Sequence, residues 1–178
     1  MTQYVDPTKE TFAEFRQNDC EGPIHMLNLV RFREKAAYPD GRDVTGAQAY
    51  AAYGNGSYPV FSKLGGRIVW RGNFELMLIG PGEEAWDECF IAEYPSVSAF
   101  VEMIRDPVYR AAVKHRQAAV LDSRLIRMAP AEAGTGLGTD GSAHSNRPFK
   151  AFDSPGLIVR ALAGMQRLSS LVQAMPPR

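Results

Sequence analysis

Residues 24–32 read IHMLNLVRF, and this stretch decides the fold. Every second position shares one face, which is apolar apart from a single amide and consists of Ile24, Met26, Asn28, Val30 and Phe32. Leu27 and Leu29 fall on the opposite face. Because apolar residues occupy both faces, the pattern predicts a strand that is covered on both sides.

Helix signals follow this strand. Thr45-Gly46-Ala47-Gln48 forms a capping box, which predicts the first turn of a helix. Gly54-Asn55-Gly56 predicts an interruption, after which a short helix restarts at Ser57. Gly65-Gly66 then predicts the end of that helix.

The remaining segments complete an order typical of one fold class. They are a strand pair at 67–70 and 74–79, a strand at 86–94, helices at 96–104 and 107–120, and a last strand at 121–128. This order of strands and helices is the split βαβ pattern, which predicts an α+β, ferredoxin-like βαββαβ domain with an antiparallel sheet over residues 23–128. Such a sheet has helices on one side only, so the second face of 24–32 needs another cover.

Three further segments flank this domain. Residues 1–22 predict an N-terminal helix, because Pro7 suits a first helical turn. Residues 129–155 are rich in Gly, Ala, Thr and Ser and predict a flexible linker. Residues 156–178 predict an amphipathic C-terminal helix that packs on the body or on a partner subunit, with a membrane-surface helix as the alternative.

Composition excludes several classes of protein. The 178 residues are 45% hydrophobic and 22% charged, and Lys+Arg and Asp+Glu balance at 20 each, which argues against a nucleic-acid partner. Cys20 and Cys89 lie far apart in no metal or redox spacing, and Cys89 is expected to be a buried free thiol. We expect no secretion signal and no transmembrane segment, since no apolar run approaches about 18 residues. The predicted compartment is the cytoplasm.

Arg116 is the most informative polar residue, because it lies on the inward stripe of the helix at 107–120. A guanidinium on an apolar face needs a carboxylate or a bound anion. One interpretation is a bridge to Glu93 that fixes helix to sheet. The other is that Arg116 holds a carboxylate or enolate oxygen of a substrate.

His115 is a candidate proton-transfer group, since its ordinary pKa lies close to neutral pH. The alternative is simple exposure at the helix edge. His25 is expected at a strand edge, and the three histidines are scattered, so we predict neither a metal site nor a cofactor. A haem role would need His115 or a tyrosine as axial ligand.

Asn28 and two tyrosines are candidate orienting groups. Asn28 interrupts an apolar face, where it either bonds a neighbour or serves as a donor to a ligand. Tyr50 and Tyr53 lie about one helical turn apart and are either core aromatics or hydroxyls above the same space.

Several runs of sequence together resemble the domain of unknown function 1330 family, in the dimeric α+β barrel superfamily. They are Tyr50-Ala51-Ala52-Tyr53-Gly54, Gly65-Gly66-Arg67-Ile68-Val69-Trp70-Arg71-Gly72, Phe90-Ile91-Ala92-Glu93-Tyr94-Pro95-Ser96, Asp106-Pro107-Val108-Tyr109-Arg110-Ala111-Ala112 and His115-Arg116-Gln117-Ala118-Ala119. The resemblance covers residues 24–128. It implies a homodimer whose two sheets face each other, which would supply the missing cover of the strand at 24–32.

The resemblance also implies a set of residues near a cavity: Tyr53, Arg67, Glu93, Tyr109 and Arg116. The chain departs from the family where an acidic residue often follows the first strand, because Arg31-Phe32-Arg33 stands there instead. No role of that acid is carried over.

Three functions are compatible with these residues. The first is a cofactor-independent enzyme of the isomerase, decarboxylase or monooxygenase type on a small oxygenated or aromatic metabolite, with His115 and Arg116 as catalytic residues. Its substrate-binding residues would be Asn28, Tyr53, Arg67, Glu93 and Tyr109. The second is a non-catalytic protein that binds a small-molecule ligand, and the third is an interaction protein that docks through its C-terminal helix.

Overall fold

The computed structural model describes residues 3–18 and 21–131. The predicted C-terminal helix at 156–178 and the predicted linker from residue 132 onward lie outside the described residues.

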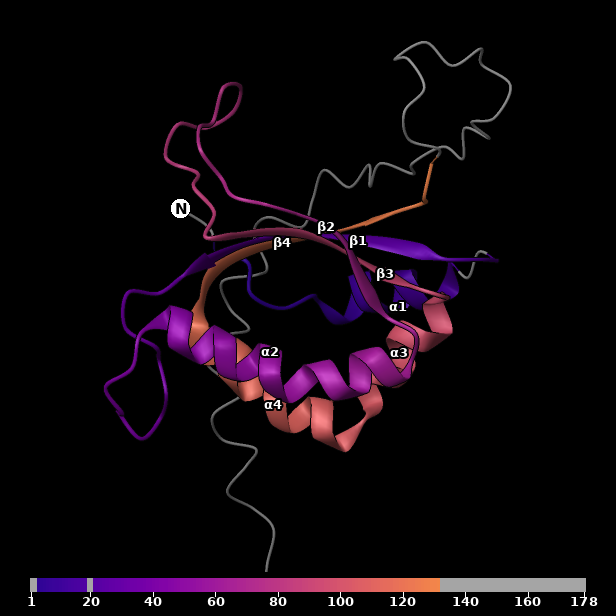
Figure 1. Cartoon of the computed structure of the whole chain (residues 1–178), viewed down its shortest axis with the longest axis horizontal. Helices are drawn as coiled ribbons and strands as arrows, with labels where there is room; N and C mark the ends of the chain where they lie inside the picture. The colour runs from indigo at the N-terminus through magenta and orange to yellow at the C-terminus, as the bar shows by residue number, and fades with distance from the viewer. Residues whose placement is uncertain (1–2, 19–20, 132–178) are drawn as a thin grey trace, which may run out of the picture. The chain divides into compact units, whose positions relative to one another are not determined.

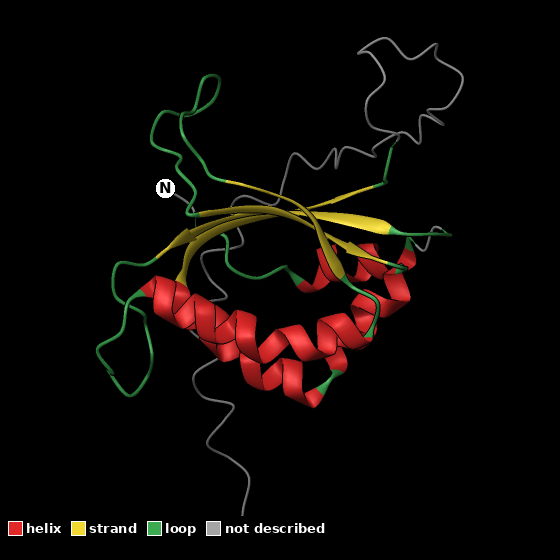
Figure 2. Ribbon diagram, in the orientation of Figure 1, coloured by secondary structure: helices red, strands yellow, loops and turns green. Residues whose placement is uncertain are grey.

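Four antiparallel strands form one sheet in the order β2-β3-β1-β4. β1 (Ile24–Phe32) has the bounds predicted from its alternating pattern, and it lies between β3 (Glu88–Tyr94) and β4 (Val120–Met128). β2 (Arg67–Gly72) is the edge strand beside β3. This order, with helices between the strands, confirms the ferredoxin-like α+β fold (Figure 2).

The helices begin at side chains that accept the free N–H groups of the first turn. Thr45 caps α2 (Gly46–Lys63) in a full capping box, Ser96 caps α3 (Val97–Arg105), and Asp106 caps α4 (Pro107–Ala119). The predicted N-terminal helix is α1 (Lys9–Gln17), which packs on α3 through Phe15 and Phe100 with ring centroids 4.9 Å apart. α2, α3 and α4 cover one face of the sheet (Figure 1).

Two apolar clusters join the sheet to these helices. The larger one packs Ile24 and Met26 of β1 against Phe61 of α2 and Phe100 of α3. The smaller one packs Val30 of β1 with alanines of α2 and α4. The alternate positions of β1 that start at Ile24 therefore face the helices.

The predicted interruption of α2 at residues 54–56 is wrong, because the helix is continuous. A Cβ on Gly56 would lie 3.0 Å from the Cβ of Ala112, so the glycine permits close approach of α2 and α4. This tertiary contact outweighs the low helix propensity of glycine. Pro59 also lies within the helix.

The predicted strand at 74–79 is also wrong. β2 continues to Gly72 and pairs directly with β3, and residues 73–87 form a long connection between them. Three apolar side chains of that connection, Leu76, Leu78 and Ile79, are 74%, 84% and 92% exposed. The run from Leu76 to Ile79 is apolar throughout, as buried strands are, but no strand among the described residues pairs with it.

The face of the sheet opposite the helices is the open face, which carries His25, Leu27, Leu29, Arg67, Trp70, Cys89, Ile91, Glu93, Arg124 and Ile126. No described helix covers it (Figure 2). Trp70 and Ile126 are about half exposed, and Cys89 is a buried free thiol as predicted. No helix among residues 3–18 and 21–131 is long and apolar enough to cross a membrane.

Candidate functional site

Three tyrosines meet between the helices and the sheet, and we call Tyr50, Tyr53 and Tyr109 the tyrosine cluster. The hydroxyls of Tyr53 on α2 and Tyr109 on α4 lie 3.3 Å apart, with their rings edge to face at 6.2 Å. Tyr50 packs on Tyr53 at 5.4 Å and on Phe32 of β1 at 4.9 Å. One helical turn separates Tyr50 from Tyr53, which explains why α2 presents both to the sheet.

Two phenols of the cluster, those of Tyr50 and Tyr109, resist ionisation. Burial raises the pKa of Tyr50 and Tyr109 well above the ordinary tyrosine value, and the neighbouring Tyr53 adds to both shifts. The positive charge of Arg116 acts in the opposite direction on both phenols. Tyr50 and Tyr109 therefore supply neutral hydroxyls near a guanidinium.

Asn28 faces the same side of the sheet as the tyrosine cluster. Its Nδ2 donates to the backbone oxygen of Met26 at 2.8 Å, which is the local hydrogen bond that sequence reasoning offered as one alternative. None of the hydrogen bonds among the described residues uses Asn28 Oδ1, and the side chain is only half-buried. Asn28 thus keeps an acceptor for a ligand on this side.

The predicted bridge from Arg116 to Glu93 is wrong. Arg116 Nη1 donates to the backbone oxygen of Val5 at 2.6 Å and lies 3.5 Å from Asp6, while Nη2 donates to Ser123 Oγ at 3.2 Å. Arg116 therefore fastens the segment before α1 to α4 and β4. The inward stripe was predicted correctly, but Val5 and Asp6 of the N-terminal segment and Ser123 of β4 are the partners.

His115 lies apart from the tyrosine cluster. Its Nδ1 is 2.5 Å from the hydroxyl of Tyr38, in the connection between β1 and α2, and the two rings meet edge to face. Burial lowers the pKa of His115, and the charges of Lys114 and Arg42 add to this shift. His115 and Arg116 are adjacent in sequence yet contact different parts of the molecule.

Glu93 and Arg67 come together on the open face with His25, the histidine predicted at a strand edge. Glu93 accepts from Arg67 Nε at 2.7 Å and lies 2.9 Å from His25 Nε2. The three residues stand side by side on β2, β3 and β1, so we call them the cross-strand triplet. The hydrogen bond from Arg67, and to a smaller extent the one with His25, lowers the pKa of Glu93.

One ion pair beside the tyrosine cluster was not predicted at all. Arg71 of β2 donates through Nη2 and Nε to the carboxylate of Glu88 on β3, with the shortest distance 2.6 Å. Both charges influence the pKa of Tyr50. The register of β2 against β3 brings this pair together, and period-2 alternation within each strand does not reveal that register.

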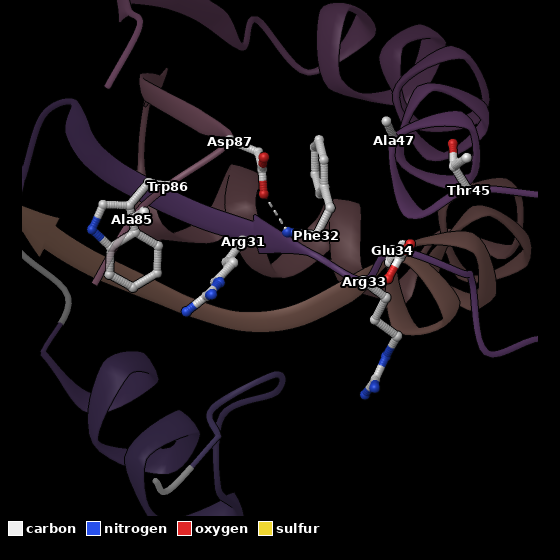
Figure 3. A pocket seen from close by; sticks show the side chains of 9 residues that line it. All are labelled: Arg31, Phe32, Arg33, Glu34, Thr45, Ala47, Ala85, Trp86 and Asp87. Carbon is white, nitrogen blue, oxygen red and sulfur yellow. Dashed lines mark hydrogen bonds between the residues drawn. The ribbon is translucent and has the colours of Figure 1, made fainter. Parts of the chain in front are cut away.

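A groove of about 540 Å³ lies where β1 ends and α2 begins, and it shares Phe32 with the surroundings of Tyr50. Its lining residues are Arg31, Phe32, Arg33, Glu34, Thr45, Ala47, Ala85, Trp86 and Asp87. The guanidinium groups of Arg31 and Arg33 point away from Thr45 and Ala47, while Asp87 turns to the N–H of Phe32 at 2.7 Å (Figure 3). Because the charged groups do not converge, the tyrosine cluster remains the better candidate.

Comparison with known proteins gives a family and a fold without an activity. A profile described as a domain of unknown function, DUF1330, matches residues 41–128. No curated protein matches the chain.

The chain is similar to a solved structure of the methylated RPA0582 protein, with 72% identity, 76% of this chain and 100% of that chain covered, and a TM-score of 0.74. A second structure, described as RPA0582 of unknown function from Rhodopseudomonas palustris, gives 72% identity, 74% and 99% coverage, and a TM-score of 0.72. A dimeric protein of unknown function and ferredoxin-like fold from Bacteroides fragilis matches at 13% identity over 60% of this chain and 94% of that one, with a TM-score of 0.39. From the profile match and the 72% identity over a whole relative, this chain belongs to the DUF1330 family of domains of unknown function.

Proposed function

We propose that this chain is a homodimeric small-molecule-binding protein, in which each subunit binds an oxygenated or aromatic metabolite at the tyrosine cluster. The open face supports the dimer. Leu27 and Ile91 stand opposite one another near its middle, with the cross-strand triplet toward one end and Arg124 toward the other. An apolar centre with a charged periphery is the usual anatomy of a protein interface.

One observation carries the ligand site. The hydroxyls of Tyr53 and Tyr109 share a single hydrogen bond, and both side chains are only half-buried. Two hydroxyls have two protons to donate, so one donor and several lone pairs stay free for a ligand oxygen. The surrounding aromatic rings offer the apolar walls that a planar ligand needs.

A second part of the proposal is that this site also catalyses a reaction, and the charge of Arg116 favours it. Its charge acts on the phenols of Tyr50 and Tyr109, so a developing enolate or carboxylate at the cluster would be stabilised. His115 as proton-transfer group is the other part of this proposal. A turnover screen with Arg116→Ala and His115→Ala tests it, and unchanged rates in both variants would remove these two assignments.

Calorimetric titration of the full chain with phenol, benzoate and 4-hydroxybenzoate tests the binding site. Tyr53→Phe and Tyr109→Phe each remove one hydroxyl and are expected to weaken binding about three- to tenfold, the worth of one hydrogen bond. Tyr58→Phe is the matched control, because Tyr58 is on α2 but 63% exposed. Equal affinity in all variants, or no saturable binding of any of the three probes, would contradict the proposal.

A further inference from the structure

The connection between β2 and β3, residues 73–87, carries an exposed apolar tip, and we call this connection the arm. Leu76, Leu78 and Ile79 are 74%, 84% and 92% exposed. Single exposed apolar residues are ordinary, but three within four positions form a patch. Connections longer than about 12–15 residues without secondary structure are uncommon in compact domains and are usually functional.

The base of the arm is fastened to the sheet. The Asp87 N–H donates to the oxygen of Val30 at 2.8 Å, and the Asp87 carboxylate accepts from the N–H of Phe32 at 2.7 Å. Glu84 pairs with Arg124 of β4 at 3.0 Å. A loop held at its base keeps its tip in place, which lowers the entropy cost of binding.

The arm extends on the side of the sheet away from the helices (Figure 1). This is the side of the open face, whose apolar residues Leu27, Ile91 and Trp70 also lack a cover among the described residues. The tip does not fold back onto that face, since its side chains are 74–92% exposed.

We propose that the arm clasps a second copy of this chain, with Leu76, Leu78 and Ile79 packed against the partner subunit beside the open-face interface. The inference rests on the proposed homodimer and extends its interface. Under two-fold symmetry a second copy covers both apolar surfaces at once, because each subunit gives one arm and receives one. A different partner would have to match the tip and the open face separately.

Charge argues against a lipid surface as the occupant. The arm carries Glu75, Glu83, Glu84 and Asp87 and neither lysine nor arginine, and an acidic segment is repelled by anionic headgroups. These four acids flank the apolar tip rather than interrupt it, as polar residues surround the core of an interface.

Light scattering after size exclusion, on the full chain, tests the arm. The double variant Leu78→Asp with Ile79→Asp places two charges in the proposed contact and is expected to raise the dimer dissociation constant about tenfold or more. Ile79→Ser is a milder change in the same direction. Val108→Asp is the matched control, because Val108 is 54% exposed on α4 in the helix layer, and it is expected to leave the constant unchanged.

Trp70→Asp separates the arm from the dimer itself, because Trp70 lies on the open face. If Trp70→Asp dissociates the dimer while the arm variants behave like Val108→Asp, the homodimer stands and the clasp is overturned. If none of the variants alters the dissociation constant, both are overturned. Far-ultraviolet circular dichroism of each variant establishes that the subunit is folded.

Discussion

His25 on β1 and Glu93 on β3 stand directly opposite one another, with Nε2 and Oε2 2.9 Å apart. Arg67 of β2 binds the other oxygen of the same carboxylate at 2.7 Å. Glu93 thus ties together three neighbouring strands on the open face, and the triplet gives that face a charged end.

Glu93→Gln is expected to change how stability depends on pH. The pKa of Glu93 lies below its ordinary value, chiefly because of Arg67, so the ionised form stabilises the fold above about pH 4.3. That contribution is lost as the pH falls through the lowered pKa. Since Arg67 is 68% exposed, we expect a loss of at most about 1 kcal/mol in Glu93→Gln near neutral pH.

Urea unfolding of the native chain and of Glu93→Gln at a series of pH values measures the difference in their free energies of unfolding. It should shrink toward zero in acid, and Glu102→Gln on α3 serves as an exposed control. A difference that stays constant in acid would show that Glu93 does not act through its charge.

His115 is expected to give stability a second dependence on pH. Its lowered pKa means that the unfolded chain binds a proton more readily, so stability is lost as the pH falls from about 6.5 through the folded-state pKa. His115→Gln should flatten the profile in this window. Equal slopes for the native chain and the variant, measured by urea unfolding, would contradict the burial of a neutral His115 against Tyr38.

Three buried tyrosines should be visible in an alkaline titration. Burial raises the pKa of Tyr50, Tyr94 and Tyr109, so these three of the seven tyrosines are expected to ionise only well above about pH 10. The ultraviolet absorbance of phenolate counts the tyrosines that titrate. Ionisation of all seven in one step before unfolding would show that Tyr50, Tyr94 and Tyr109 are open to water.

Substitutions of two glycines of α2 should change the stability of the protein in opposite directions. The Cβ added by Gly54→Ala meets no atom within 4 Å. This variant is expected to stabilise the protein by about 0.5–1 kcal/mol, because alanine is the better helix former. Gly56→Val is expected to destabilise it by about 1–3 kcal/mol, since its Cβ would press on Ala112 of α4. Thermal unfolding measures both, and similar shifts would contradict the close approach of α2 and α4.

The sequence predicted those features that depend on local chemistry. Alternation gave the bounds of β1, and the caps at Thr45, Ser96 and Asp106 gave the helix starts. The glycines within α2 misled the prediction, because a helix contact that is distant in sequence compensates for their propensity. The segment at 74–79 has strand-like hydrophobicity but no partner strand within residues 3–18 and 21–131.

The candidate site was harder to predict. Helical spacing placed Arg116 and Tyr109 on an inward stripe, and Tyr109 indeed meets Tyr53. Two partners of Arg116, Val5 and Asp6, lie more than a hundred positions away in the sequence, and no hydrophobic periodicity reveals such distant contacts. The cross-strand triplet likewise depends on the register of three strands, which hydrophobic patterns within single strands do not fix.

Sedimentation equilibrium of the full chain over a range of concentrations tests the central claim, that the open face of the sheet is covered by a second copy. The proposal predicts a mass of about 39 kDa, twice the 19.6 kDa of one chain. A mass of 19.6 kDa that persists at the highest concentration would contradict it, because the open face would then remain in contact with water.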